Sequence, residues 1–271
     1  MLLKDQYQVI KKLGSGGMGE AFLALDLVSH QQVAVKLLHH GVDHSETQHH
    51  WITQHFLNEA KALRLIDHPG VVKLIETGET EDGHQFLVME FIEGASLRSQ
   101  IDPYYGLLGG FERVAVLVRQ LGEALSAAHE AGVYHRDLKP ENILLTEVGS
   151  PNEQIKVIDF GIATVKDRLD DQTKTTVLAG SLHYFAPEQL DGHPTAASDI
   201  FALGVIAYEL VTGRTPFRPD RPYPAAIFQL SELHQAGVRV NPKDLRPSLP
   251  VAAQEIILKA LSYQPTARPA T

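Results

Sequence analysis

The spacing of apolar residues changes near residues 90–95, and this change limits the fold more than any other feature. Before it, short apolar runs separated by turn signals are typical of strands, and one stretch has helical spacing. The strand-like runs are 7–13, 21–27, 31–38, 71–78 and 84–91, and the helical stretch is 55–66. Further helices are predicted over 111–132, 198–212, 224–236 and 251–262. The pattern therefore predicts a small sheet lobe joined to a larger helical lobe.

Composition excludes several classes of function. The 271 residues include no cysteine and carry a formal net charge of −9. Without cysteine the chain forms no disulfide, no cysteine-ligated zinc site and no thiol nucleophile, and a reducing cytoplasm is the expected location. The negative charge gives no reason to expect a nucleic acid or an anionic membrane as partner.

No segment of the sequence predicts contact with a membrane. Residues 1–13 lack the apolar core of a signal peptide. The most apolar run, IFALGVIAYELV at 200–211, contains Glu209 and is too short to span a bilayer, so it predicts a buried helix. The sequence ends in ARPAT, inside apparently folded sequence. We therefore expect the protein to continue beyond residue 271, where a membrane anchor could follow.

A glycine-rich stretch, LGSGGMGEA, lies between the first two long strands and places glycine at 14, 16 and 19. Glycines let a backbone fold closely over phosphate groups and offer its N–H groups to them. The alternative is a flexible hairpin turn. A dinucleotide site would require a helix after the glycines, and a strand follows here, which disfavours that class.

Charged residues in apolar surroundings mark three further positions. Lys36 ends the strand-like VAVK, and Glu59 lies on the following helix, where an ion pair could aim the ammonium at phosphate oxygens. The alternative is a lysine that reaches solvent. Asp159 ends the apolar strand IKVID, which suits a metal ligand or, alternatively, a turn before glycine. The stretch YHRDLKPENILL, 134–145, concentrates charges that need partners when buried.

The order of these motifs resembles one family. The glycine loop, VAVK, Glu59, HRDLKPEN, DFG and FAPEQ follow one another as in eukaryotic-type protein kinase domains, from the first strand to Arg268. GSGGMGEA and APEQ are most similar to bacterial PknB-like serine/threonine kinases. The resemblance implies an α+β, bilobal fold over residues 1–271. Its small antiparallel sheet and one helix occupy about residues 1–92, and a mainly helical lobe occupies about 93–271.

The resemblance also implies an activity and its partners. The domain would transfer the γ-phosphoryl group of ATP to serine and threonine hydroxyls of proteins, with Mg²⁺, or Mn²⁺ in its place, as cofactor. Asp137 would accept the proton of the attacking hydroxyl, and Lys139 would neutralise charge on the migrating group. Asn142 and Asp159 would hold the metal. Protein substrates are the expected partners, with transient self-association for autophosphorylation between two molecules.

The nucleotide site follows from the same resemblance. Lys36, paired with Glu59, would hold the α- and β-phosphates, and Met89 would lie behind the adenine. Ala21 stands where the family usually has valine, which reduces apolar contact with the adenine. The expected ATP-binding residues are Leu13, Gly14, Ser15, Gly16, Gly17, Gly19, Ala21, Ala34, Lys36, Glu59, Met89, Glu90, Ile92 and Leu144.

Regulation is expected in the segment between DFG and APE. This segment offers Thr173, Thr175 and Thr176, and Arg136 beside the catalytic aspartate would pair with a phosphate there. The alternative is three solvated loop threonines. Ser181 stands where serine/threonine kinases usually have threonine, and its hydroxyl can serve the same contacts.

Two ion-pair or bracing contacts complete the resemblance. Glu188 is expected to pair with Arg268, and Asp199 is expected to brace the catalytic loop. Outside the resemblance, the segment from His39 to His55 holds six histidines, and His40 and His44 have a spacing that suits a metal on a helix. The alternative there is a solvated loop.

Two other functions compete with that of an active kinase. A pseudokinase, which binds nucleotide and signals by its shape, would be favoured by loss of Lys36, Asp137, Asn142 or Asp159, and all four are present. A small-molecule phosphotransferase would share the catalytic loop. The APEQ segment argues against it, because in protein kinases this region builds the surface on which a peptide lies.

Overall fold

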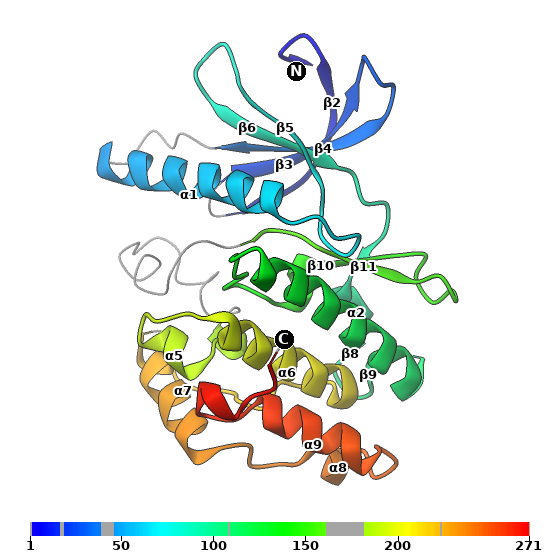
Figure 1. Cartoon of the computed structure of the whole chain (residues 1–271), viewed down its shortest axis with the longest axis vertical. Helices are drawn as coiled ribbons and strands as arrows, with labels where there is room; N and C mark the ends of the chain where they lie inside the picture. The colour runs from blue at the N-terminus through cyan, green and yellow to red at the C-terminus, as the bar shows by residue number, and fades with distance from the viewer. Residues whose placement is uncertain are drawn as a thin grey trace. The chain divides into compact units, whose positions relative to one another are not determined.

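The computed structural model describes residues 2–16, 19–38, 46–107, 109–160, 182–222 and 224–270. The chain divides into two compact units, Met1–Glu93 and Gly94–Thr271. Figure 1 shows the strands of the first unit and the helices of the second.

The first unit is an antiparallel sheet of six strands with the order β1-β2-β3-β4-β6-β5. Its strands are β1 (Leu2–Leu3), β2 (Tyr7–Gly16), β3 (Gly19–Asp26), β4 (Gln32–Leu38), β5 (Leu74–Glu79) and β6 (Gln85–Glu90). The two longest, β2 and β3, form the hairpin that carries the glycine-rich stretch, with Gly16 opposite Gly19 at its end. The predicted antiparallel sheet is confirmed.

The two faces of this sheet have different neighbours because side chains alternate along a strand. One face contributes a buried cluster with Tyr7, Val35 and Val88 at its centre. The other face places Leu38 and Leu87 against Phe56 and Ala60 of helix α1 (Glu46–Leu65). Figure 1 shows α1 lying along the sheet.

Helix α1 begins at Glu46, well before the predicted start near residue 55. Residues 46–54 are mostly polar, so they show no apolar period that would predict a helix. Of the six histidines, His49, His50 and His55 lie on α1, and their side chains are outside the described part of the chain. The remaining three, His39, His40 and His44, lie outside the described residues.

The second unit is mainly helical. Its α-helices are α2 (Gly110–Glu130), α5 (Pro187–Leu190), α6 (Ala196–Thr212), α7 (Ala225–Ala236), α8 (Pro242–Leu245) and α9 (Val251–Ala260). Strands β10 (Ile143–Thr146) and β11 (Gln154–Val157) pair with each other, and β7 (Ala95–Ser96) joins them. A second small sheet pairs β8 (Ile101–Asp102) with β9 (Gly106–Leu107). The 3-10 helices in the described part of this unit are η1 (Leu97–Gln100), η2 (Pro140–Asn142), η4 (Leu182–Tyr184) and η5 (Pro265–Ala267).

Helix α6 is the centre of this unit. It packs against α2 and α9, and Figure 1 shows it between them. Almost all of its residues are buried, as the apolar run predicts, and two of them are acidic: Asp199 is 1% exposed and Glu209 is 6% exposed. Carboxylates at such depth require partners, so α6 orders the residues around it. Among the described residues, no helix is both apolar and long enough to span a membrane.

His234 on α7 is a buried polar side chain without a hydrogen-bond partner among the residues that the structure describes. It is 2% exposed, and neither ring nitrogen is bonded. Its ring meets Phe201 and Phe217 edge-on, with centroids 5.1 and 4.7 Å away. Burial, helped by the positive charge of Arg268, lowers the pKa of His234 to about 3. The imidazole is therefore neutral in the folded protein.

We predict that His234→Leu reduces the loss of stability in mild acid. The unfolded chain binds a proton on His234 below a pKa of about 6.5, whereas the folded protein does so only near 3, so stability falls as pH drops between these values. Between pH 7 and 5 the wild type should lose about 2 kcal/mol more than the variant. Urea unfolding at each pH measures this. The exposed His193→Leu is the matched control, and equal slopes for His234→Leu and wild type would contradict the prediction.

Candidate active site

The loop between α2 and β10 is held by one carboxylate of α6. Asp199 Oδ2 accepts the backbone N–H of His135 at 2.8 Å, and Oδ1 accepts that of Arg136 at 2.9 Å. His129 Nε2 lies 2.8 Å from Oδ2. The expected brace of the catalytic loop by Asp199 is therefore present, and it fixes the backbone directly before Asp137.

Two residues at this site have an unfavourable backbone conformation. Arg136 has φ 64° and Asp159 has φ 54°, both in the left-handed region, which costs a residue with a Cβ on the order of 1 kcal/mol. Gln189 of α5 helps to hold the first, because its Nε2 donates to Arg136 O at 2.8 Å. Such conformations persist only where surrounding bonds impose them, and they place the Asp137 and Asp159 segments in defined positions.

The His135 side chain contacts both the Asp137 and the Asp159 segment. It is fully buried, its Nδ1 accepts the Asp137 N–H at 3.3 Å, and its Nε2 lies 3.1 Å from Ile158 O. This pattern assigns the proton to Nε2 in a neutral ring. Burial also lowers the pKa of His135. The ring lies against Phe160, 4.8 Å between centroids.

The side chains of the HRDLKPEN stretch contact one another. Lys139 Nζ lies 2.9 Å from Asp137 Oδ2, with side chains 17% and 12% exposed. Asn142 Nδ2 donates to Asp137 O at 2.9 Å, which leaves the Oδ1 atom of the amide as its outward acceptor. Ile158 N donates to Asn142 O at 2.9 Å, so Asp159 directly follows a residue that is bonded to Asn142.

An amide oxygen and a carboxylate oxygen placed in this way fit a hard cation. Mg²⁺ prefers oxygen ligands and is commonly held by only one or two protein groups together with phosphate oxygens. Asn142 and Asp159 supply such a pair from the ends of two bonded segments. The residues present therefore fit the metal that the resemblance implies.

In the first unit, Lys36 of β4 meets Glu59 of α1. Its Nζ lies 2.8 Å from Oε2 and 2.9 Å from Oε1, so the expected ion pair is present. The side chains are 16% and 5% exposed. Cross-strand register places Ala21 opposite Lys36, and Met89 opposite Ala34. Directly opposed residues share a face, so this face of the sheet carries the ammonium and the small alanines.

The glycines of the hairpin differ in what surrounds them. A Cβ at Gly19 would lie 2.1 Å from the Leu37 carbonyl oxygen of β4, so only glycine fits the sheet there. At Gly14 a Cβ would meet nothing within 4 Å. The open space beside Gly14 is compatible with close approach of a ligand to the backbone. Gly17 lies outside the described residues.

The other expected nucleotide residues stay predictions, and the structure gives only their positions and exposure. Leu13 and Ser15 are exposed on β2, and Gly16 ends that strand. Glu90 is joined to Lys73 by two bonds, and Ile92 follows β6 half-buried. Leu144 is only partly covered on β10. Thr173, Thr175, Thr176 and Ser181 lie outside the described residues.

The expected pair of Glu188 and Arg268 is buried and bidentate. Arg268 Nη1 and Nη2 lie 2.6 and 2.8 Å from the two carboxylate oxygens, and Ser198 donates to Glu188 Oε1 at 2.7 Å. Burial alone would raise the pKa of Glu188, but these bonds lower it. The pair fixes the end of the chain to the APEQ segment.

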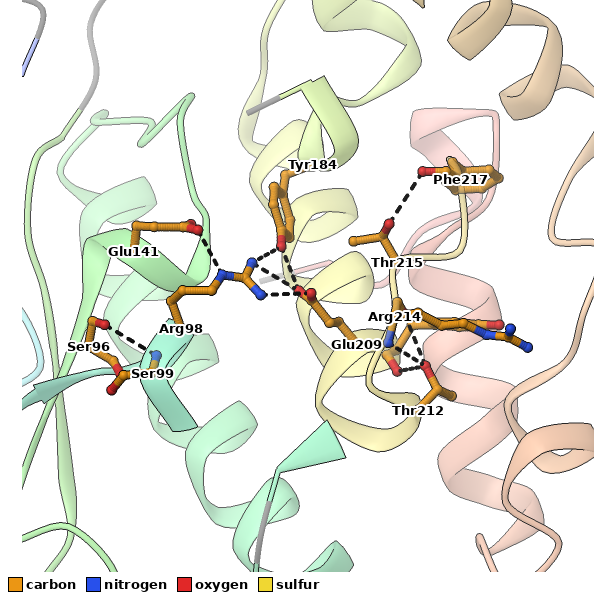
Figure 2. Close-up of polar contacts among 11 residues, drawn as sticks. Ser96, Arg98, Ser99, Glu141, Tyr184, Glu209, Thr212, Arg214, Thr215 and Phe217 are labelled. Atoms are coloured by element: carbon orange, nitrogen blue, oxygen red, sulfur yellow. Dashed lines mark hydrogen bonds and ion pairs between the residues drawn. The ribbon is translucent and has the colours of Figure 1, made fainter. Parts of the chain in front are cut away.

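A second, partly buried cluster of charge centres on Arg98, outside the motifs. Arg98 of η1 bonds Glu141 at 2.7 Å and Glu209 at 2.8 Å, and also contacts the Tyr184 hydroxyl (Figure 2). The one signal in the sequence was Glu209 itself, a single acid inside an apolar helix. Nothing in the sequence pattern indicates that its partner lies 111 residues earlier in the chain.

Comparison with known proteins identifies the family. The family model described as "Protein kinase domain" matches residues 7–271. The chain is 38% identical over 270 residues to the serine/threonine-protein kinase pkn3 of Myxococcus xanthus and 36% identical over 264 residues to PrkC of Bacillus subtilis. These alignments include 98% and 97% of this chain, and they cover 48% of pkn3 and 38% of PrkC. A probable serine/threonine-protein kinase PknB of Corynebacterium glutamicum is 35% identical over 272 residues, with 98% of this chain and 40% of that protein covered.

The chain therefore belongs to the protein kinase family, and the predicted family and fold class are confirmed. It spans less than half the length of these curated relatives.

We predict that Asp199 substitutions destabilise the second unit in a graded order. Asp199→Ala leaves the His135 and Arg136 amides without an acceptor, and each unpaired buried donor costs about 1–3 kcal/mol, so the total should be about 2–6 kcal/mol. Asp199→Asn keeps one oxygen and should lie between alanine and wild type. Urea unfolding measures the order. Asp191→Ala, on the exposed end of α5, is the control, and a wild-type midpoint for Asp199→Ala would refute the brace.

Proposed function

We propose that this domain transfers the γ-phosphoryl group of ATP to serine and threonine hydroxyls of proteins. The observation that carries the proposal is the bonded chain Lys139–Asp137–Asn142–Ile158, which gathers a carboxylate, an ammonium and an amide directly before Asp159. Phosphoryl transfer requires positioning and charge stabilisation more than covalent chemistry from the protein. This arrangement supplies both.

Each side chain has a defined task in the proposed reaction. The Asp137 carboxylate, held by Lys139, orients the substrate hydroxyl and accepts its proton. The Lys139 ammonium stabilises negative charge on the group in transit. When bound, Mg²⁺ neutralises phosphate charge, and the Asn142 Oδ1 atom and the Asp159 carboxylate are the groups that would hold it.

In the first unit, the Lys36 ammonium, fixed by Glu59, would bind the α- and β-phosphates. A pair that is mostly removed from water is a stronger and better oriented phosphate ligand than an exposed lysine, because charge interactions strengthen as water is excluded. The adenine would lie on the face that bears Ala21, Ala34 and Met89. Leu13, Glu90, Ile92 and Leu144 complete the proposed nucleotide site.

Two alternatives are weaker on specific grounds. A nucleotide-binding scaffold without activity does not require Asp137, Asn142 and Asp159; all three are present, and the first two are hydrogen-bonded within the loop. A small-molecule phosphotransferase does not require the APEQ segment, which here is anchored by Glu188 and Gln189. Lys139 and Glu141 favour serine and threonine over tyrosine as acceptors. We propose a cytoplasmic location for the domain and protein substrates as its partners.

We predict that Asp137→Asn and Asp159→Asn each reduce phosphate transfer by at least ~100-fold, because one removes the proton acceptor and the other weakens the metal site. Asparagine keeps the size of both side chains and tolerates the left-handed backbone of Asp159. Transfer of labelled phosphate from ATP to a general protein substrate measures the rate. Asp191→Asn is the surface control, and unfolding curves verify the fold. Wild-type rates in either site variant would refute the assignment.

We predict autophosphorylation at Thr173 or Thr175, with Thr176 third. A phosphothreonine carries about −1.5 to −2 charges and three acceptor oxygens, which suit the Arg136 guanidinium beside Asp137. Mass spectrometry of wild-type protein and Asp159→Asn after incubation with ATP and Mg²⁺ tests this. The phosphate should be present in the first and missing from the second. Full activity in a variant with all three threonines replaced by alanine would end the hypothesis.

A further inference from the structure

The second unit contains a pocket of about 280 Å³ beside the Arg98 cluster. Its lining includes Arg98 from η1, His183 and Tyr184 from η4, Glu209 from α6, and Arg218 from the loop after α6. All of these belong to one compact unit. None of them has a task in the reaction described above.

Arg98 uses its guanidinium to join three segments at the wall of this pocket. Its Nε bonds Glu141 Oε1 at 2.7 Å, its Nη1 bonds Glu209 Oε1 at 2.8 Å, and its Nη2 reaches both Glu209 Oε2 at 3.3 Å and the Tyr184 hydroxyl (Figure 2). The guanidinium also lies 5.9 Å from the centre of the Tyr184 ring. The Arg98 side chain is 34% exposed, so it still borders the pocket.

The Glu209 carboxylate, which lines the pocket, already has partners. Glu209 is the one acidic residue among the described residues that line it, and both of its oxygens are occupied. Oε1 pairs with Arg98, and Oε2 accepts the Tyr184 O–H at 2.5 Å as well as Arg98 Nη2. A basic side chain entering the pocket would therefore meet no unpaired carboxylate, and it would meet the Arg98 charge.

Arg218 adds a positive charge that has no ion pair among the described residues, and it is exposed. Arg214 also borders the pocket, although its side chain extends away from Arg98 in Figure 2. His183 Nδ1 lies 3.2 Å from Phe217 O. The balance of charge in the lining is positive, and Coulomb attraction favours an anionic group there.

The pocket adjoins the segments that would hold a protein substrate. Glu141, which Arg98 bonds, lies in the same short helix as Asn142 and two residues after Lys139. His183 and Tyr184 follow Ser181 almost directly along the chain. A polypeptide with its hydroxyl at Asp137 would therefore have neighbouring side chains within reach of this pocket.

We propose that this pocket is a subsite for an acidic side chain of the protein substrate, and that Arg98 and Arg218 determine this specificity. The inference rests on the proposed kinase function and names a substrate class for it. Arg98 acts in two ways: it keeps Glu141 and Glu209 from binding a basic side chain, and together with Arg218 it attracts an acidic one.

The test uses peptides with a single threonine and with Glu, Ala or Arg at each neighbouring position in turn. We expect wild-type kcat/KM to be about tenfold higher for Glu than for Arg at one position at least. Arg218→Ala should reduce this ratio about threefold or more, by loss of one exposed charge interaction. Arg239→Ala makes the same charge change on an exposed site away from the pocket and should leave the ratio unchanged.

Arg98→Met is the sharper variant, because it exposes two carboxylates to the pocket and should reverse the preference from Glu to Arg. A purely structural role for Arg98 would instead lower the rate for all peptides equally, and that result would overturn its part in specificity. Equal Glu-to-Arg ratios for wild type, Arg218→Ala and Arg239→Ala would overturn the subsite as a whole.

The outcome also separates this inference from the proposed function. If wild-type protein phosphorylates neither itself nor any peptide with ATP and Mg²⁺, the proposed kinase function fails. If it phosphorylates peptides without preference between Glu and Arg at any position, the kinase function stands and the acidic subsite is wrong.

Discussion

Helix α6 is apolar along almost its whole length, yet the carboxylate of Asp199 lies within its first turn at 1% exposure. A buried carboxylate is tolerated only with full hydrogen bonding, and the partners here are the amides of His135 and Arg136. A largely buried helix of the second unit therefore sets the position of the catalytic loop. The left-handed conformation of Arg136 follows from this tie, and the direction of Asp137 follows from Arg136.

The same principle recurs wherever charge enters the interior. Glu209 of α6 collects Arg98, Glu188 collects Arg268, and Lys36 meets Glu59 in the first unit. Each pair joins segments that are distant in the chain, so each fixes geometry as well as compensating for lost hydration. The cations differ in their setting: the Lys36 and Lys139 ammonium groups are proposed phosphate ligands, each within its own unit, whereas the Arg98 charge borders a pocket.

Most residues of the candidate site could be proposed from the motifs, because these residues lie close together in the sequence. Asp137, Lys139 and Asn142 lie within one turn-like stretch, and their mutual bonds follow from that spacing. The start of α1 was not predicted, since residues 46–54 carry no apolar period, which is the sequence signal for an amphipathic helix. His234 gave no sign of its unbonded state, because an isolated histidine on a helix has no pattern that reveals its neighbours.

The class of fold and the family follow from the sequence, and so does the proposal of the reactive side chains, because periodicity and short motifs are properties of neighbouring residues. The tertiary structure alone decided which distant charges meet. Nothing in the sequence distinguishes Arg98 from a surface arginine, and only the fold of the second unit brings its side chain to Glu209. Once two carboxylates share that guanidinium, the charge of the pocket beside them is decided by three-dimensional proximity, which no local pattern encodes.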